Sequence, residues 1–228
     1  FALARTDSAI VPSLNLVRIA RDIWQLPAGR ILYVPNGVDL ARFSAAPDRS
    51  LLQGWPEDAV VIGTVAPMRP EKNLGRLIRA FAAIAGTRNI RLLLVGDGPE
   101  RAGLEALAAE RGIADKVRFA GYLDSPERAF GLMDVYAMSS DTEQMPNALI
   151  QAMAAARPVA ATDVGDVAHI VAPECRGFVV PAADDAAYRD SLARLADDAA
   201  LRANVGQANL RRVRAEYDQD RMFEAYRA

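Results

Sequence analysis

The chain has 228 residues and a formal net charge of −2, and 51% of its residues are hydrophobic and 25% charged. Such a composition is typical of an ordinary globular protein with one large domain, or with one domain and an appendage. The weak negative charge excludes the basic surface on which nucleic-acid binding depends. No stretch approaches ~18 consecutive apolar residues, so no transmembrane helix is expected.

The scarcity of cysteine and histidine limits the metal chemistry open to this chain. Cys175 is the single cysteine and His169 the single histidine, which excludes an internal disulfide and a multi-histidine or zinc–thiolate centre. Both residues are interpreted as structural. Asp218 and Asp220 form an acid-x-acid pair in the expected helical tail, where a solvated helix cap is the simpler interpretation. We expect no metal site and no required cofactor.

The first elements expected along the chain are a strand, a helix and a second strand. A short strand is predicted within residues 7–12, and Ser13 is placed to cap a helix that continues to about Trp24. The Leu-Pro-Ala-Gly sequence at 26–29 ends this helix. A second strand is predicted over 30–35 and ends at an Asn-Gly turn.

The next strand and helix flank the first candidate binding loop. Residues 60–65 are apolar and β-branched, as in a buried strand, and an amphipathic helix is predicted from Leu74 to about Ile84. The loop between them contains two cations, Arg69 and Lys72. Open α/β sheets bind ligands at the carboxyl ends of their strands, and such charges suit a diphosphate. The alternative is a solvated pair that balances a neighbouring glutamate.

A loop with two glycines follows the strand predicted over 91–95. Gly96 and Gly98 begin like a dinucleotide-binding fingerprint, but Arg101 occupies the position of the third glycine, which argues against a Rossmann dehydrogenase. The two glycines more simply permit a tight turn, and Pro99 suits the first position of the helix that follows. The elements expected next are a strand over 117–120, a helix over 124–133 and a strand over 134–138.

The stretch from Ser139 to Gly165 contains the second candidate site. Pro146 suits the first position of a helix that follows a polar loop. A helix N-terminus that opens at a strand end offers N–H groups and partial positive charge to an anion such as a phosphate. Glu143 would repel that anion, so its carboxylate is better suited to accepting hydrogen bonds from sugar hydroxyls. The alternative is that Glu143 only complements the helix dipole.

The rest of the chain continues the same alternation of strands and helices. A strand is predicted over 159–162, another over 177–181, and helices over 185–196, 198–208 and 210–228. This alternation predicts a doubly wound α/β fold with a mostly parallel sheet, helices on both faces and right-handed crossovers. The candidate residues all follow strands, so we expect them at one edge of the sheet.

A resemblance to a known family joins these observations. Glu143, Ala152-Met153-Ala154 and Pro158-Val159 resemble the signature of the retaining GT-B glycosyltransferases of family four, the glycosyl transferases group 1. In that signature a Glu is followed after seven residues by a second Glu, and then by Ala-Met-Ala and Pro-Val. This sequence departs from it at Gln151, in place of the second Glu, and at Ala156, where a Gly is common. A third departure is a proline, Pro67, where the family has an arginine.

The resemblance implies a domain organisation. Residues 1–29 would be the end of an N-terminal domain and a linker. Residues 30–228 would be a nucleotide-sugar-binding C-terminal domain with a helical tail, the Rossmann-like half of a GT-B fold. Because the acceptor would bind to the N-terminal domain, this chain alone is expected to be inactive. The resemblance also implies a cytoplasmic transferase, with the inner face of the membrane as the alternative, and leaves open a peripheral membrane contact through the N-terminal domain.

The implied reaction is transfer of a sugar from a nucleotide-diphosphate donor to an acceptor hydroxyl with retention of configuration, as in the synthesis of cell-envelope polysaccharide, lipopolysaccharide or glycolipid. Lys72, together with Arg69, would neutralise the leaving diphosphate, and Glu143 would hold hydroxyls of the donor sugar. Lys72 and Glu143 are the catalytic candidates. The other implied donor contacts are Tyr122 beside the base, Gln151 at the ribose, and Gln144, Met145, Pro146 and Asn147, whose segment offers backbone N–H groups to phosphate or sugar oxygens.

Two alternatives stay open at this point. The three departures from the signature favour a non-catalytic nucleotide-binding or scaffolding domain. A nucleotide-sugar epimerase is the other alternative, because the same fold and the same class of donor serve both reactions.

Overall fold

The computed structural model describes residues 7–44 and 46–227. Its strands are β1 (Ala9–Val11), β2 (Ile31–Tyr33), β3 (Val60–Val65), β4 (Ile90–Val95), β5 (Val117–Gly121), β6 (Val135–Met138), β7 (Val159–Asp163) and β8 (Val179–Pro181). Its helices are α1 (Leu14–Asp22), α2 (Leu74–Ala85), α3 (Arg101–Glu110), α4 (Glu127–Phe130), α5 (Asn147–Ala154), α6 (Val167–Ile170), α7 (Asp185–Asp197), α8 (Ala199–Glu216) and α9 (Gln219–Arg227). Short 3₁₀ turns lie at Ala28–Arg30, Leu40–Ser44, Arg49–Leu52, Pro70–Lys72, Ala114–Lys116 and Pro173–Phe178.

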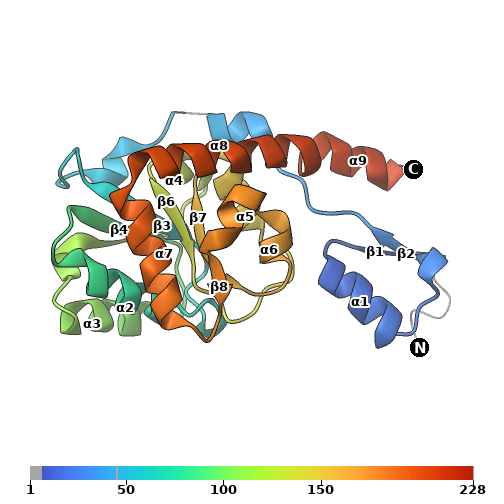
Figure 1. The fold of residues 1–228 in the computed structure, drawn as a ribbon, viewed down its shortest axis with the longest axis horizontal. Coiled ribbons are helices and arrows are strands. Elements are labelled where there is room, and N and C mark those ends of the chain that lie inside the picture. The colour runs from blue at the N-terminus through green and yellow to red at the C-terminus, as the bar shows by residue number, and fades with distance from the viewer. Residues whose placement is uncertain (1–6, 45, 228) are drawn as a thin grey trace.

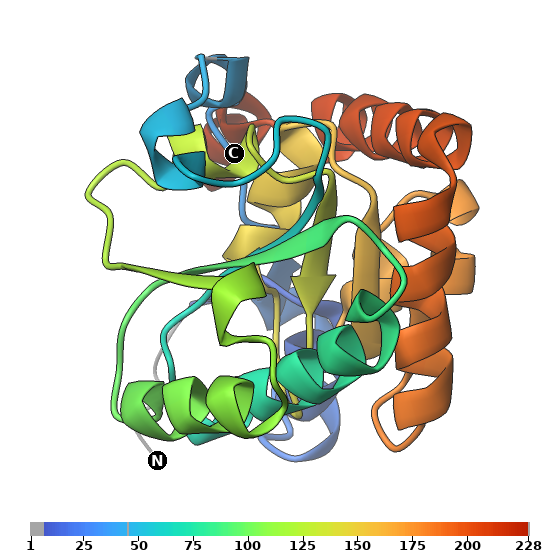
Figure 2. The same ribbon diagram turned by 90° about the vertical axis from the view of Figure 1, so that its left-hand side faces the viewer.

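The main sheet has six strands in the order β5-β4-β3-β6-β7-β8, and every pairing in it is parallel. The chain proceeds outward from β3 to β5, then returns to pair β6 with β3 and proceeds to β8 on the other side. Helices α2, α3 and α7 cover one face of the sheet, and α4, α5 and α8 cover the other (Figure 2). This arrangement confirms the predicted doubly wound α/β fold with its parallel sheet.

Apolar burial explains why these segments form these elements. The strands are covered on both faces, and Ile62, Leu93 and Val135 from three adjacent strands are fully buried. The apolar stripe predicted for α2 is also buried, and its members are Leu74, Leu77, Ile78 and Phe81. Within the described residues, no helix is long and apolar enough to cross a membrane.

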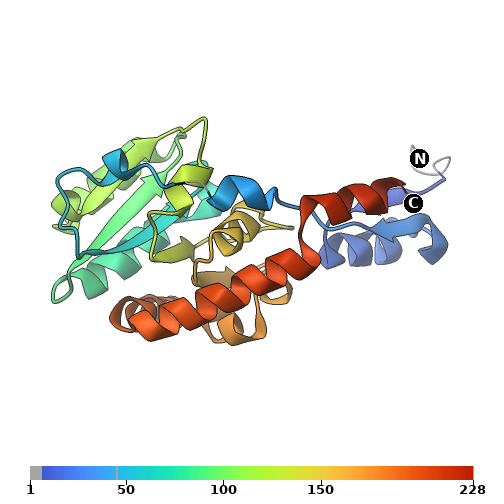
Figure 3. The same ribbon diagram turned by 90° about the horizontal axis from the view of Figure 1, so that it is seen from above.

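A second, smaller unit lies at one end of the molecule. It consists of β1, α1 and β2, and its two strands pair in parallel with each other (Figure 1). The strand predicted over 30–35 is therefore present as β2, and it pairs with β1 and not with the main sheet. Helix α9 extends from α8 over this same end of the molecule (Figure 3).

The linker between the two units is held at the junction of α8 and α9. The N–H group of Val38 donates to the carbonyl oxygen of Tyr217 at 2.8 Å, and the N–H group of Gln219 donates to the carbonyl oxygen of Val38 at 3.2 Å. The segment that enters the main unit, at Val38, is thus hydrogen-bonded to the segment that leaves it, at Tyr217 and Gln219.

Several predicted helix boundaries are wrong. Helix α3 begins at Arg101 with Glu100 at its cap, two residues after the predicted start at Pro99. Pro146 immediately precedes α5 and is not its first residue. Helix α4 is a single turn, because Gly131 and the residues after it form a turn instead of continuing the helix.

Regular structure also occurs where none or less was predicted. No regular element was predicted for the stretch with His169 and Cys175, but it contains α6 and the 3₁₀ turn of Pro173–Phe178. Helix α8 continues to Glu216, so the break between the last two predicted helices, expected at residue 209, lies instead at residues 217–218. Buried residues on its inner face, Val205 and Val213 among them, hold this longer helix on the main unit.

Candidate functional site

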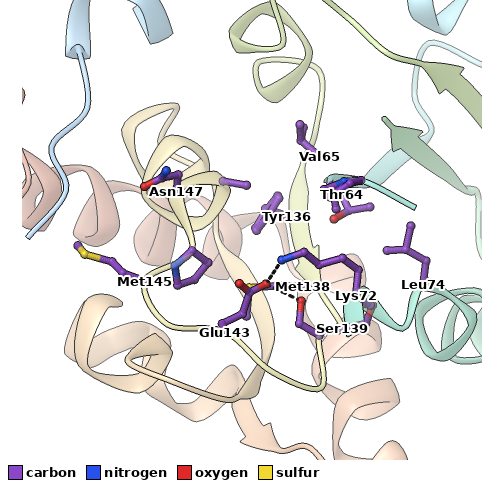
Figure 4. Close-up of a pocket in the computed structure, with 15 residues that line it drawn as sticks. Thr64, Val65, Lys72, Leu74, Tyr136, Met138, Ser139, Glu143, Met145 and Asn147 are labelled. Carbon is purple, nitrogen blue, oxygen red and sulfur yellow. Dashed lines mark hydrogen bonds and ion pairs between the residues drawn. The ribbon is translucent and has the colours of Figure 1, made fainter. Parts of the chain in front are cut away.

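The candidate site lies where the direction of strand order reverses. Strands β3 and β6 are neighbours, so the loops that follow them lie side by side at the carboxyl edge of the sheet. Between these loops is a cleft of about 300 Å³ (Figure 4). It is lined by Thr64, Val65, Ala66, Pro67, Lys72, Leu74, Tyr136, Met138, Ser139, Ser140, Glu143, Met145, Pro146, Asn147 and Ala148.

Two opposite charges meet in this cleft. The Nζ atom of Lys72 donates to Oε1 of Glu143 at 2.5 Å, and the side chains are 20% and 11% exposed (Figure 4). The hydroxyl of Ser140 donates to the same carboxylate oxygen at 2.8 Å. Both charges are thus partly withdrawn from water, where an ionic contact is stronger than on an open surface.

A tight turn places Lys72 at the start of α2. Residues Pro70–Lys72 form the 3₁₀ turn, and Asn73 follows in the left-handed region with φ 42°. Asparagine is one of the few residues that adopt this conformation readily. Its side chain also caps α2 by accepting a hydrogen bond from the N–H group of Arg76 at 3.2 Å.

Hydrogen bonds fasten the two loops to each other. The hydroxyl of Ser139 donates to the carbonyl oxygen of Lys72 at 3.0 Å, and the N–H group of Asp141 donates to that of Glu71 at 2.9 Å. The guanidinium of Arg76 donates to Ser139 O at 2.9 Å and to the Asp141 carboxylate at 2.8 Å, and it also pairs with Asp185 of α7. The positions of Lys72 and Glu143 are therefore set by neighbouring contacts and not only by each other.

The N-terminal end of α5 opens on the same cleft. Pro146, Asn147 and Ala148 line it, so the positive end of the helix dipole faces the space beside Lys72. The side chains of this segment are partly engaged elsewhere. Asn147 Oδ1 accepts from Asn36 Nδ2 at 2.8 Å, and Met145 Sδ accepts from the N–H group of Asn36 at 3.2 Å.

Two of the residues that the resemblance implies as contacts of the sugar donor line other hollows. Arg69 lines a shallow groove of about 610 Å³ between α2 and α3, together with Arg79 and Glu100. Its backbone is extended, with φ −121° and ψ 156°, so the 3₁₀ turn after it separates it from Lys72. Gln151 lines a hollow of about 280 Å³ beside the linker. The structure therefore does not place Arg69 in the cleft as a substitute for the arginine expected at position 67.

The remaining implied residues are also outside the cleft. Tyr122 is 75% exposed. The amide oxygen of Gln144 accepts hydrogen bonds from Asn15 Nδ2 at 3.1 Å and from the hydroxyl of Ser13 at 3.4 Å, so this side chain contacts α1 and not the cleft. Of the implied set, the cleft brings together Lys72, Glu143, Met145, Pro146 and Asn147.

The sequence did not single out the polar residues that form the floor of the cleft. Thr64 of β3 and Tyr136 of β6 both line the cleft. Burial raises the pKa of the Tyr136 phenol well above its ordinary value, so this hydroxyl stays protonated. Ser140 was missed as well, and Thr162 Oγ1 donates to its carbonyl oxygen at 2.6 Å. The sequence feature that could have indicated these residues is a hydroxyl side chain within an apolar strand or directly after it.

Comparison with known proteins identifies the family of the chain. The family model "Glycosyl transferases group 1" matches residues 52–212, which include both loops of the cleft. The chain belongs to the group 1 glycosyltransferases. The D-inositol 3-phosphate glycosyltransferase of Streptomyces avermitilis is 35% identical over 82% of this chain and 44% of its own length. The lipopolysaccharide core biosynthesis glycosyltransferase LpsD of Rhizobium meliloti is 29% identical over 75% of this chain and 49% of its own length.

Solved structures agree with the family at the level of the fold. The chain superimposes on HepE from Anabaena, determined in complex with UDP, with a TM-score of 0.87 and 19% identity, over 97% of this chain and 63% of that one. The main unit is thus the Rossmann-like domain of a GT-B glycosyltransferase. The chain of this group 1 glycosyltransferase spans about half the length of the curated relatives it matches.

Proposed function

We propose that the protein transfers a sugar from a nucleotide-diphosphate donor to an acceptor hydroxyl with retention of configuration, and that the cleft binds the donor. The observation that carries this proposal is the pair of Lys72 and Glu143 at the positive end of α5, on the loops that follow the adjacent strands β3 and β6, where the strand order reverses. Ligands of doubly wound sheets bind at this point. An ammonium and a helix N-terminus suit a diphosphate, and a carboxylate suits sugar hydroxyls.

Lys72 is assigned to the diphosphate. In this structure its ammonium is paired with Glu143, and a bound diphosphate would offer it a stronger partner with more negative charge. As the bond between the sugar and the phosphate breaks, negative charge develops on the leaving diphosphate. The ammonium and the N-terminus of α5 would stabilise that charge, and stabilisation of this kind usually contributes most to the rate of such a reaction.

Glu143 is assigned to the donor sugar. Once Lys72 turns to the diphosphate, Oε1 keeps its hydrogen bond from Ser140 and the carboxylate has free capacity to accept from hydroxyls. Its carboxylate is mostly withdrawn from water, so a hydroxyl that replaces Lys72 would be held in a defined direction. Tyr122, Gln151 and Arg69 keep the roles of base, ribose and diphosphate contacts only as further proposals, since each would have to be reached from the edge of the cleft.

The proposal extends to the biological setting. The acceptor would be a glycan or glycolipid of the cell envelope, bound by a part of the protein outside this chain, and the present chain alone would bind nucleotide weakly and transfer nothing. Action in the cytoplasm, with contact at the inner face of the membrane through that other part, belongs to the same proposal. A metal ion is not needed by it, because Lys72 and the helix supply the positive charge.

Calorimetric titration of the chain with uridine, guanosine and adenosine diphosphates tests the site. We expect one of the three to bind, and Lys72→Met to weaken that binding by about a hundredfold, since a charge-assisted contact to phosphate is lost. Lys116→Met is the matched control. Lys116 is the other lysine, and its Nζ donates to the carbonyl oxygen of Ala85, away from the cleft.

A second measurement uses the same two lysines. The bound nucleotide should protect Lys72 from acylation and leave Lys116 as reactive as before. No heat with any of the three diphosphates, together with equal acylation of both lysines with and without nucleotide, would contradict the proposed site. In the full-length protein, conversion of the nucleotide sugar without an acceptor would indicate an epimerase, and binding without any turnover would indicate a non-catalytic domain.

A further inference from the structure

We infer that Asp166 and Gln144 are positioning residues, which fasten the β1–α1–β2 unit to the loop of Glu143 and thereby hold that carboxylate in place. The kinetic part of this inference rests on the proposed function, whereas the structural part does not. Neither residue lines the cleft. Both act through backbone and side-chain contacts with the segment that carries Glu143.

Asp166 joins the turn after β7 to the first turn of α1. Its Oδ2 accepts from the N–H group of Leu14 at 2.5 Å, and its Oδ1 accepts from that of Asn15 at 3.0 Å. The side chain of Ser13 accepts from the next free N–H group, that of Leu16, at 3.0 Å. The first N–H groups of a helix have no acceptor within the helix, and a carboxylate there also meets the positive end of the dipole. Asp166 therefore completes the capping of α1 from a distant part of the chain.

Gln144 contacts both sides of this junction. Its amide oxygen accepts from Asn15 Nδ2 at 3.1 Å and from Ser13 Oγ at 3.4 Å, so it holds the start of α1. Its backbone carbonyl oxygen accepts from the N–H group of Asp166 at 3.1 Å. The residue directly after Glu143 is thus bonded to α1 and to the residue that caps α1.

The turn before Asp166 packs against the backbone of Glu143 itself. Gly165 has φ 57°, and a side chain there would collide with the carbonyl oxygens of Glu143 and Gln144. Asp166 is only 6% exposed, so the turn is packed closely against the segment of Glu143. Displacement of the turn or of α1 would therefore displace Glu143.

Apart from its ion pair with Glu143, Lys72 forms no hydrogen bond with Asp166, Gln144 or α1 in the described residues. It stands on the loop after β3, which is fastened to Ser139 and Asp141 and not to α1. Loss of the contacts at Asp166 should therefore disturb the carboxylate that we assign to the sugar and spare the ammonium that we assign to the diphosphate. This separation distinguishes a positioning role from a general loss of stability.

The experiment uses Asp166→Asn in the full-length protein. Asparagine keeps the shape but places an NH₂ group opposite one of the two N–H donors of α1. We expect kcat to fall by about tenfold or more while the Kd for the nucleoside diphosphate changes by less than about threefold. Amide hydrogen exchange should become faster in both 13–16 and 142–147. Asp58→Asn is the control, since Asp58 is exposed and forms no hydrogen bond to any residue of the described ranges.

A second variant keeps the inference testable if Asp166→Asn does not fold. Gln144→Met retains the side-chain length but removes the acceptor for α1, and it should accelerate exchange in the same two segments. Faster exchange in 13–16 with unchanged exchange in 142–147 would overturn the inference, because Asp166 would then only cap a helix. Unchanged kcat in a variant with altered exchange would also overturn it. If the wild-type protein transfers no sugar, the proposed function fails, but the exchange data still decide whether the two segments are coupled.

Discussion

Ser140 is the residue that would keep Glu143 oriented once the donor has bound. It donates to the same carboxylate oxygen that accepts from Lys72, and Lys72 would leave that oxygen for the diphosphate. We therefore expect Ser140→Ala to lower kcat by about tenfold, the value of one hydrogen bond to a charged group. The Kd for the nucleoside diphosphate should stay within about twofold, since Ser140 touches the carboxylate and not the ammonium. Steady-state kinetics and calorimetry on the full-length protein measure the two quantities.

A matched serine controls for the loss of a hydroxyl as such. Ser44 also donates its hydroxyl hydrogen to a nearby acceptor, the carbonyl oxygen of Ala41, but it is outside the cleft. Ser44→Ala should leave kcat unchanged. Equal kinetic effects of the two substitutions would show that Ser140 has no special relation to Glu143.

The direction of individual side chains was the part of the site that the sequence predicted least well. Lys72 and Glu143 were expected at one edge because each follows a strand, and the cleft brings them together. Gln151 follows Asn147 by four residues on α5, so both face the linker and the hollow beside it. Arg69 is separated from Lys72 by a turn whose backbone angles no pattern of residue types specifies. Spacing along the chain predicts which loop a residue belongs to. The backbone angles of the loop, or the face of the helix on which the residue lies, determine what its side chain contacts.

The end of α5 contains a strained residue that a single substitution can relieve. Ala156 has φ 57°, and the N–H groups of Arg157 and Ala156 donate to the carbonyl oxygens of Ala152 and Met153. This is the Schellman arrangement, in which the residue at this position is usually Gly. We expect Ala156→Gly to raise the free energy of unfolding by about 0.5–1 kcal/mol, since the relief of a left-handed alanine exceeds the extra chain entropy of glycine. Urea denaturation measures this difference.

The neighbouring alanine provides the control for that prediction. Ala155 is one position earlier and has φ −79°, which any residue adopts. Ala155→Gly should lower the free energy of unfolding by about 1 kcal/mol or more, because glycine raises the entropy of the unfolded chain and the buried methyl group of Ala155 is lost. Stabilisation by both substitutions, or by neither, would contradict the assignment of strain to Ala156.

At the level of elements, long apolar runs were predicted well and short or irregular ones were not. Strand β3 and helix α2 have the predicted position, because their apolar residues have a clear period and are buried. The partner of β2 was not predicted, since the period of a strand carries no information on its neighbour. Helix α6 and the 3₁₀ turn after it are too short for a periodic pattern. Tertiary packing and not local preference sets such segments.

Across the whole molecule, the exposed apolar side chains gather at the end formed by the small unit and α9. They include Ile23, Trp24 and Leu32 of the small unit, and Phe223 and Tyr226 of α9. A two-stranded sheet is marginal by itself. The main unit, by contrast, has its large apolar side chains inside, with Tyr122 as the exposed exception among the described residues. The contacts of Asp166 and Gln144 therefore join the main unit, which has a buried apolar core, to the small unit, whose two-stranded sheet is marginally stable by itself.

The rate at which the thiol of Cys175 is labelled can measure how often the main unit opens. Its thiol is fully buried behind α8 and lies near the amide of Asn209, and burial raises its pKa to about 11. A thiol reacts as its thiolate, so at about pH 8 we expect no labelling by a thiol reagent in the folded protein and complete labelling after denaturation. The labelling rate in native buffer would report how often the main unit opens.

Asn209 provides the variant that should change this rate. Its Oδ1 accepts from the N–H group of Ala172 at 3.1 Å, and its Nδ2 donates to the carbonyl oxygen of Arg157 at 3.1 Å, so it joins α8 to two buried turns. Asn209→Ala would leave a buried N–H group without its acceptor, at a cost of about 2 kcal/mol, and opening should become roughly thirtyfold more frequent. Ser44→Cys in a Cys175→Ala background gives the rate of an exposed thiol. Labelling of native Cys175 at that rate would mean that α8 does not close over the main unit as the structure shows.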